Sequence, residues 1–591
     1  MPLRRDQVPA SRKWNLGLMI SGEEELEQLV AEVKAAIPGF AKYNRKLNAE
    51  NAIDCLNELS ATARKAERLY VYSFMKCDEN TADTRFQALS SRMEMLYTEF
   101  SSAVSFVMPQ LSRLPEKTLR QMLMRPEYAD YTNTINELIR EKKHMLSDKE
   151  EKMMSEFSTF MGDFEQIFTR IDNADMRFED VVADGKPVKL SHGTYSVLLQ
   201  HPDQNVRKDA FEKYYKAYMS LKNTLAASYA GNVKKNCALA KVRKYKSALQ
   251  HALYAEGISD KVYNNLIKAV NKGTPAVHEY VALRKKALGL KELHMYDMYV
   301  PLTKEYDLSL EYDEAYRLVI SALAPLGEKY RSILEEAYRS NWIDVEETEN
   351  KRSGAYHWGV YDSPPFVLLN YQKTAHDVFT IAHELGHAIH SYHSKHAQCY
   401  NKADYAIFVA EIASTVNEVL LLKYLLKTAE GEQRKFLLSY YLDMFRTTLF
   451  RQTMFAEFEK FAHSQIEAGI PLTHESLSAH YLELNKKYYG EAVVHDEQIA
   501  YEWSRIPHFY KGSAFYVYKY STGLTAAVNI VSRILSDNSF VEKYFRFLSA
   551  GSSMLPPDIL KLVDIDLSAS EPFDYAMSEF AATLEELQKL V

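Results

Sequence analysis

The sequence predicts a mainly α-helical protein that also contains a small antiparallel β-sheet. Apolar residues recur at every third or fourth position over long stretches, which is the period of an amphipathic helix. Residues 354–361 and 365–371 instead favour strands, and the Asp-Ser-Pro sequence between them fits the turn of an antiparallel pair. The chain has 591 residues, 47% apolar and 26% charged, so it can bury a large core in more than one lobe.

Residues 22–180 are predicted to form a helical N-terminal lobe. Their segments, such as EEELEQLVAEVKAAI, keep the helical spacing of apolar residues. Pro109, Pro115 and Pro126 fall at the expected helix boundaries, where the missing backbone N–H of proline does least harm.

The pattern changes over residues 181–208. Asp184-Gly185 and short runs of alternating polarity predict a hairpin or a connecting segment there, and helices resume from about residue 204. We therefore divide the chain into a helical N-terminal lobe, residues 1–185, and a second domain, residues 186–591.

The candidate metal site begins in the sequence TIAHELGHAIHSYHSKH, residues 380–396. This segment contains His383, Glu384 and His387 in the H-E-x-x-H pattern. Residues four apart lie on one face of a helix, so both imidazoles can reach one zinc ion, with Glu384 beside it as a base. A chance match is the alternative, but the apolar flanking residues favour a buried helix over a solvated run.

A third ligand is expected on the strongly apolar helix at residues 401–427. Its carboxylates Glu411 and Glu418 are seven residues apart and therefore share a face. A buried unpaired carboxylate is costly, and a metal with its ligands would supply a partner. Glu411 is the candidate third ligand, which completes a catalytic rather than a structural zinc site. Glu418 either orients a ligand imidazole or forms a salt bridge to another helix.

The other histidines near this pattern are expected to have different roles. His390, His393 and His396 follow at three-residue spacing, which drifts around the helix and disfavours a second metal site. His390 is a candidate for supporting a ligand, and the other two are expected at the surface. His357 occupies a strand position that could face a substrate, but neither it nor His376 is expected to be catalytic.

Composition argues against several other classes of protein. The four cysteines are scattered without CxxC spacing and predict neither disulfides nor a thiolate zinc site. No apolar run of signal-peptide length follows the basic N-terminus, and no stretch of about eighteen apolar residues occurs, so we expect a cytoplasmic protein without a membrane partner. The net charge of −7 is spread along the chain and gives no footprint for nucleic acid.

Four stretches in order resemble the M3 family of zinc metallopeptidases, most closely its oligoendopeptidase F branch. They are GAYHWGVYDSPPFVLLNY, TIAHELGHAIHSYHS, FVAEIASTVNE and RIPHFYKGSAFYVYKYSTG. The resemblance implies a two-lobed helical molecule with a deep channel, a zinc ion on the channel wall and short unstructured peptides as substrates. It further implies that His383, His387 and Glu411 hold one Zn²⁺ per chain and that Glu384 is the general base.

The fourth stretch carries the remaining implied roles. His508 and Tyr518 match the residues that hydrogen-bond the oxyanion in the family, with Tyr510 and Tyr516 as alternatives because the spacing from histidine to tyrosine is shorter than in the thimet-like branch. A phenol or an imidazole can donate a hydrogen bond to developing charge. Without the resemblance, these aromatic residues would be interpreted mainly as core packing.

We therefore expect a zinc-dependent endopeptidase that hydrolyses internal bonds of oligopeptides, with Glu384 activating the zinc-bound water. One alternative is a zinc peptidase that trims termini, of the carboxypeptidase or dipeptidyl carboxypeptidase type. The other is a helical peptide-binding protein without activity. Cleavage of blocked peptides distinguishes the first alternative, and metal content distinguishes the second.

Overall fold

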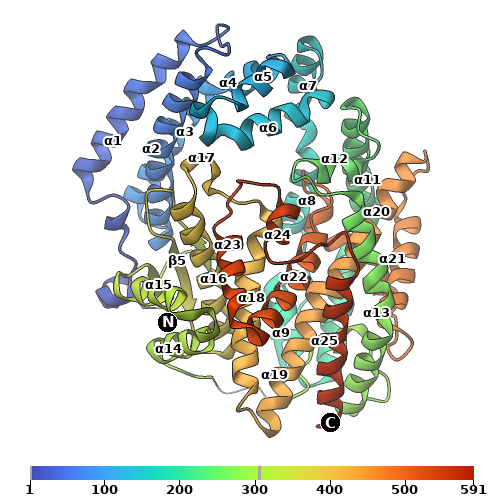
Figure 1. The fold of residues 1–591 in the computed structure, drawn as a ribbon. Coiled ribbons are helices and arrows are strands. Elements are labelled where there is room, and N and C mark those ends of the chain that lie inside the picture. The colour runs from blue at the N-terminus through green and yellow to red at the C-terminus, as the bar shows by residue number, and fades with distance from the viewer. Residues whose placement is uncertain (1–2, 304–307) are drawn as a thin grey trace. The chain divides into compact units, whose positions relative to one another are not determined.

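The computed structural model describes residues 3–303 and 308–591 (Figure 1). Helices account for 71% of the structure, about twice the usual share in globular proteins, which confirms the prediction of a mainly α fold. Among the described residues, each helix is too short or too polar to span a bilayer.

The chain forms two compact units, and each is assembled from three separate stretches of sequence. The first unit contains residues 1–143, 307–425 and 530–564, whereas the second contains residues 144–306, 426–529 and 565–591. Each unit therefore depends on contacts between segments that are far apart along the chain.

Long N-terminal helices open the first unit, and α2 packs against α3. Asp83 caps α3 by accepting a hydrogen bond from the backbone N–H of Arg85 at 2.9 Å. Apolar side chains such as Leu69 and Phe100 are buried in these helices. The helices of this region are α1 (Glu23–Ala36), α2 (Ala52–Glu79), α3 (Thr84–Val104), α4 (Val107–Arg113), α5 (Glu116–Leu123) and α6 (Thr132–Glu141).

The middle segment of the first unit contains a three-stranded sheet and the helices around it. Strands β4 and β5 pair antiparallel, with His357 opposite Val367, which confirms the predicted pair. A third strand, β3, adds in parallel to the other side of β5 and was not predicted. The elements are α14 (Tyr312–Ala322), α15 (Gly327–Arg339), β3 (Ile343–Glu346), β4 (Tyr356–Trp358), β5 (Phe366–Tyr371), α16 (Ala375–Ala397), α17 (Tyr400–Ala403) and α18 (Ile407–Leu426).

Helix α16 is the centre of this segment. It packs against β4, β5, α14, α15 and α23 (Val541–Leu548), so it is covered by stretches from both before and after it in the sequence. The last stretch of the first unit also contains α24 (Pro556–Lys561).

The second unit is again helical, with one small hairpin. Strands β1 (Val181–Ala183) and β2 (Lys186–Val188) pair antiparallel around Asp184-Gly185, as predicted, but the following residues form helix α9 rather than a connection. The helices are α7 (Asp148–Met161), α8 (Asp163–Arg170), α9 (His192–Leu198), α10 (Gln204–Ser220), α11 (Lys222–Val242), α12 (Ala248–Tyr254), α13 (Asp260–Ala287), α19 (Gly431–Met444), α20 (Arg451–Glu467), α21 (His474–Tyr489) and α25 (Glu571–Gln588). Helix α22 (Tyr518–Ser536) contributes residues to both units.

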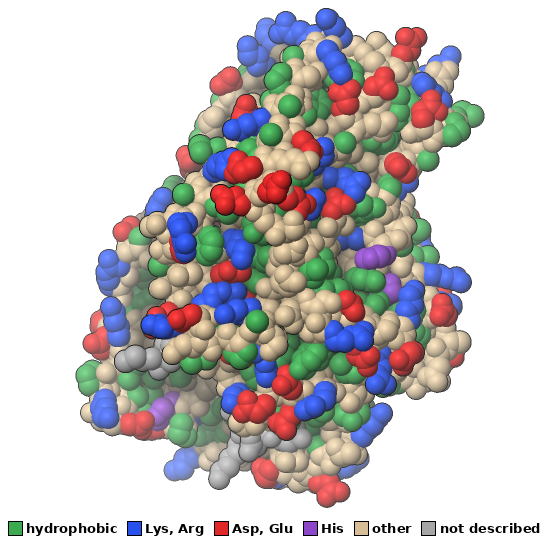
Figure 2. Space-filling view, turned by 90° about the vertical axis from the view of Figure 1, so that its left-hand side faces the viewer, with side chains coloured by type: hydrophobic (Ala, Val, Ile, Leu, Met, Phe, Trp, Pro, Cys, Tyr) green, Lys and Arg blue, Asp and Glu red, His purple; other side chains and the backbone are tan. Residues whose placement is uncertain are grey.

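Charged side chains of both signs alternate over the face shown in Figure 2. Lysine and arginine lie next to aspartate and glutamate there, and neither sign forms a continuous field. This mixture is typical of a solvated protein surface.

Candidate active site

The two histidines of the H-E-x-x-H pattern lie one turn apart on α16. The helix begins at a capping box in which the Thr374 side chain accepts from the backbone N–H of Asp377, and the Asp377 carboxylate accepts from the backbone N–H of Thr374. The rings of His383 and His387 are 4.8 Å apart, centroid to centroid, and nearly perpendicular. The predicted single face for the two imidazoles is thus present.

Glu411 of α18 meets both imidazoles. Its Oε2 lies 3.6 Å from Nε2 of His383 and 3.5 Å from Nε2 of His387. The Ser414 hydroxyl donates to the same Oε2 at 3.3 Å and steadies it. One atom from each of these three metal-ligand candidates lies within 4.8 Å of the others, so the three side chains can hold one ion.

Charges within this group favour a cation. Burial alone would raise the pKa of Glu411, but the hydrogen bond and positive field of His387, together with His383, outweigh it and lower that pKa. An ionised carboxylate therefore faces the two ring nitrogens. Two imidazoles and one carboxylate form the donor set of a catalytic zinc site, so the residues present fit that metal.

Glu418 lies two helical turns after Glu411 on α18 and contacts His383. Its Oε1 accepts a hydrogen bond from Nδ1 of His383 at 2.6 Å, which leaves Nε2 facing Glu411. Burial opposes a positive charge on His383, but the Glu418 carboxylate outweighs it and raises the pKa of the ring to about 9. Glu418 thus contacts a candidate ligand imidazole on the neighbouring helix, which fits both of the roles considered for it.

A neighbouring amide fixes the two helices to each other. Asn417 donates from Nδ2 to the carbonyl oxygen of Ala382 on α16 at 3.0 Å. Its Oδ1 accepts from the hydroxyl of Tyr330 on α15 at 2.9 Å. Asn417 is fully buried, and its role depends on which helix packs against α18, so the sequence carried no signal for it.

At Gly386 the backbones of α16 and α18 approach each other closely. A Cβ atom placed there would lie 2.5 Å from the Cα of Ser414 and 2.7 Å from the carbonyl oxygen of Ala413. Only glycine permits this separation, which brings Glu411 within reach of the histidines. Gly386 lies inside the H-E-x-x-H pattern, but its contact with α18 could not be predicted from spacing on one helix.

Glu384 lies beside the three candidate ligands and is buried. Its exposed fraction is 7%, and Oε2 has no hydrogen-bond partner in the structure. Burial raises the pKa of this carboxyl group, against the fields of His383 and His387. A carboxylate with one unused oxygen at this position is placed to accept a proton from a water molecule.

The sheet flanks the site through His357 of β4. Its ring lies 6.2 Å from the ring of His387, centroid to centroid, and its Nε2 is buried without a hydrogen-bond partner. Burial, with the neighbouring His387, lowers the pKa of His357 well below its usual range, so the ring is neutral. A neutral imidazole aimed at the site can hydrogen-bond a peptide.

The additional histidines of α16 depart in part from expectation. His396 is exposed, as predicted, but His393 is only 4% exposed, and the prediction of a surface position is wrong. His393 packs on Phe545 of α23, at 5.0 Å between ring centroids, which covers that side of α16. His390 stacks on Tyr405 at 3.7 Å, and burial lowers its pKa to about 3. Among the described residues, His390 contacts aromatic rings and forms no hydrogen bond with a metal-ligand candidate, so the contact expected of a supporting residue is not seen.

The residues predicted for the oxyanion belong to the second unit. His508 follows Pro507 in a short 3₁₀ turn, Pro507–Phe509, and its Nε2 lies 3.3 Å from the hydroxyl of Tyr520. Its ring also stacks on Tyr516 at 5.6 Å. Burial and nearby Lys511 lower the pKa of His508 to about 4.

The three tyrosines considered for this role differ in their surroundings. Tyr518 is fully buried, with its ring 5.1 Å from that of Tyr263. Tyr510 is also fully buried, and its hydroxyl donates to the carbonyl oxygen of Ser504 at 3.2 Å. Tyr516 is half-buried and touches His508. The structure thus associates His508 with Tyr516 and with Tyr520, which lies in the same sequence stretch but was not predicted.

Comparison with known proteins identifies related chains over the full length. The profile of peptidase family M3 matches residues 197–579, and that of oligopeptidase F matches residues 110–178. Oligopeptidase PepF of Bacillus subtilis is 40% identical over 99% of this chain and 88% of its own. Group B oligopeptidase PepB of Streptococcus agalactiae is 38% identical over 99% of this chain and 98% of its own.

Solved structures agree with these sequence relatives. The oligoendopeptidase-F of Enterococcus faecium is 34% identical, covers 96% of this chain and 99% of its own, and superposes with a TM-score of 0.74. A structure from Chlamydophila abortus is also 34% identical, covers 100% of both chains, and has a TM-score of 0.92.

Proposed function

The chain belongs to peptidase family M3 and is a metalloendopeptidase of the oligopeptidase F type, and from this premise we propose that it cleaves internal bonds of short unstructured peptides with one bound zinc ion. The observation that carries the proposal is the position of Glu384, a buried carboxylate with a free oxygen beside His383, His387 and Glu411. A structural metal site has no use for a base at that position.

His383, His387 and Glu411 are the proposed ligands. When bound there, zinc would lower the pKa of a coordinated water and polarise the peptide carbonyl. Glu418 keeps the Nε2 of His383 turned towards the metal position through its hydrogen bond to Nδ1. The negative charge of Glu418 also strengthens this imidazole as a donor.

Glu384 is the proposed general base. Its carboxylate accepts the proton of the attacking water and passes it to the leaving amine of the cleaved bond. Because burial raises its pKa, Glu384 is a stronger base than a solvated glutamate. The neutral His357 on the other side of His387 can donate to or accept from the peptide main chain.

The oxyanion is proposed to receive hydrogen bonds from His508 and a tyrosine, as the family resemblance implies. The buried ring of Tyr518 favours a role in the core over the predicted contact with the oxyanion. Tyr520, whose hydroxyl meets His508, and Tyr516, whose ring stacks on it, are the better candidates. Each such donor contributes about 3 kcal/mol to the transition state in other enzymes.

The sequence division at residue 185 is also part of the proposal. The three ligand candidates and the base all lie within residues 186–591, together with the M3 match at residues 197–579. We assign catalysis to that domain and a supporting role to residues 1–185.

The test compares Glu384→Gln with the unaltered protein. Glu384→Gln should keep its zinc, measured by elemental analysis after dialysis, and lose nearly all turnover of a quenched fluorescent peptide. Glu411→Gln should lose the zinc as well. His396→Gln, an exposed residue of the same helix, is the matched control and should keep both. Full activity in Glu384→Gln would exclude the proposed base.

A second measurement decides where the chain cuts. A peptide blocked by acetylation and amidation should be cut at an internal bond, and mass spectrometry identifies the products. Loss of cleavage on blocking either end would instead show a terminus-trimming peptidase. A chelator should abolish cleavage, and zinc should restore it.

A further inference from the structure

A cavity of about 430 Å³ opens in the first unit on the opposite face of β4 from the metal-ligand candidates. The two faces of β4 are distinguished by ring contacts. The ring of His357 lies 6.2 Å from that of His387, whereas the next residue, Trp358, has its ring 6.4 Å from that of Tyr70 on α2. Successive side chains of a strand point to opposite faces, so Trp358 lines the cavity while His357 faces the metal site.

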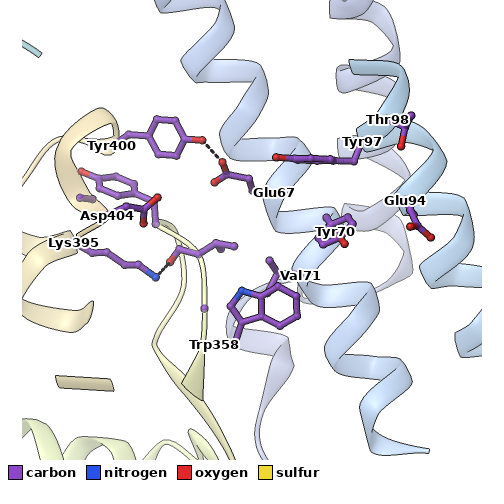
Figure 3. A pocket seen from close by; sticks show the side chains of 14 residues that line it. Glu67, Tyr70, Val71, Glu94, Tyr97, Thr98, Trp358, Lys395, Tyr400 and Asp404 are labelled. Carbon is purple, nitrogen blue, oxygen red and sulfur yellow. Dashed lines mark hydrogen bonds between the residues drawn. The ribbon is translucent and has the colours of Figure 1, made fainter. Parts of the chain in front are cut away.

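Aromatic side chains form much of the cavity wall (Figure 3). Tyr70 of α2 and Tyr97 of α3 lie 5.1 Å apart, centroid to centroid, and Trp358 stands next to Tyr70. On the other side, Tyr361 and Tyr400 meet edge to face at 5.7 Å. These rings offer several electron-rich faces to whatever enters.

The charged residues of the wall are mainly acidic. Glu67, Glu94 and Asp404 are its three carboxylates, and Lys395 is its single amine, so the wall has a formal charge of −2 when all four are ionised. Lys395 already donates to the carbonyl oxygen of Val360 at 3.0 Å. Burial lowers the pKa of Lys395 to about 8, against the attraction of Asp404 and Glu67.

The three carboxylates differ in whether other side chains of the protein already pair with them. The hydroxyl of Tyr400 donates to Glu67. Glu94 and Asp404 are exposed, and neither forms an ion pair with a described residue. Aromatic faces next to free carboxylates are the surroundings that bind ammonium and guanidinium groups in proteins.

We propose that this cavity binds the cationic side chain of a peptide substrate, an arginine or a lysine, and selects basic residues at one position of the peptide. This inference rests on the proposed peptidase function. β4 is an edge strand, with β5 on one side, so an extended peptide can pair along its other side. Side chains of such a peptide alternate between the two faces of β4, and every second one is directed to the face on which the cavity lies.

The first test uses zinc-loaded enzyme and pairs of fluorescent peptides that differ only by arginine or citrulline at one position. Citrulline keeps the shape and loses the charge. Scanning the position should identify one at which kcat/KM is about tenfold or more higher with arginine, as expected for a cation near two carboxylates and a ring. An equal kcat/KM at every position would overturn the proposal.

Variants that should lower or raise the ratio of kcat/KM for arginine to that for citrulline then test whether the preference arises in the cavity. Glu94→Gln combined with Asp404→Asn should reduce the ratio of arginine to citrulline to near unity, chiefly by lowering kcat/KM for the arginine peptide. Lys395→Met removes the competing amine and should increase the ratio. Glu99→Gln, an exposed residue elsewhere on α3, should not change it. Loss of activity on both peptides in the double variant, or a ratio that it does not change, would contradict the assignment.

Acetylation of the peptide separates two sources of positive charge. If the amino-terminal ammonium enters the cavity instead of a side chain, acetylation removes the preference, and the side-chain proposal is wrong. If the side chain enters, the ratio of arginine to citrulline survives acetylation.

A binding measurement keeps this inference separate from the proposed function. Arginine amide, added to the chelator-treated protein, should change the fluorescence of Trp358, and Trp358→Phe should abolish that change while the other tryptophans stay in place. Citrulline amide should produce no change. Binding without any peptide hydrolysis would support the cavity and contradict the peptidase. Hydrolysis without arginine amide binding or a charge preference would support the peptidase and contradict the cavity.

Discussion

Replacement of Gly386 by alanine tests whether the separation of α16 and α18 determines metal binding. The new Cβ would lie 2.5 Å from the Cα of Ser414, whereas ordinary contact begins at 3.4 Å, so α18 must retreat by about 0.9 Å. Glu411 lies one turn before Ser414 on α18 and would move with it. Zinc sites tolerate deviations of only about 0.2 Å in ligand distance, so this retreat takes the carboxylate out of range.

Two quantities should change in Gly386→Ala. Overpacking should lower the free energy of unfolding by about 1–3 kcal/mol. Zinc affinity should fall by at least about tenfold, since even loss of a supporting residue behind a ligand has that effect. Competition with a fluorescent zinc chelator measures the affinity, and urea unfolding of the zinc-free protein measures the stability.

A matched substitution provides the control for Gly386→Ala. Gly193 lies in the first turn of α9, and a Cβ there would meet no atom within 4 Å. Gly193→Ala should therefore leave zinc affinity unchanged and should not destabilise the protein. Wild-type zinc affinity in Gly386→Ala would refute the argument that close packing at this glycine positions Glu411.

Three further predictions concern other titratable side chains. Glu418→Gln should weaken zinc binding by about 10–100-fold, measured by the same competition, because its charge supports His383; unchanged affinity would contradict this role. Glu459 is fully buried, and burial raises its pKa to about 8, against a hydrogen bond from the backbone N–H of Phe515. Ionisation of Glu459 in the folded state is therefore unfavourable. The protonated side chain makes its full contribution to stability below about pH 4.5, and this contribution is lost as pH rises towards 8. Unfolding in urea at several pH values measures the free energy of unfolding. This free energy should rise in Glu459→Gln relative to the unaltered protein by up to about 1.4 kcal/mol per pH unit. A difference that does not change with pH would be inconsistent with the raised pKa. Lys351→Met should cost about 3 kcal/mol or more of stability in urea unfolding, because the buried Asp344 loses one of its two cationic partners; a loss below 1 kcal/mol would show that Arg5 alone suffices.

Much of the site could be predicted because its information is local. His383 and His387 lie on one helix, and their spacing determines their common face. Glu411 could be proposed from the cost of a carboxylate on an apolar helix. The antiparallel pairing of β4 and β5 is also local, since the two strands follow each other in the sequence with residues 359–365 between them.

The remainder depends on contacts between distant segments. Strand β3 has four residues and pairs in parallel, so no hairpin turn in the sequence indicates it. His393 was placed at the surface because nothing in its helix indicates that Phe545, some 150 residues later, covers it. The role of Gly386 likewise depends on the neighbour that packs against it.

The division of the proposed metal ligands between α16 and α18 would link metal concentration to folding. Because two ligands come from one helix and the third from another, an ion bound by all three resists separation of the helices. Each tenfold rise in free zinc above the dissociation constant adds about 1.4 kcal/mol to the stability of the folded form. If zinc is the ion bound there, as proposed, a shortage of zinc would leave the folded form less stable, and the unfolded form would be exposed to proteolysis.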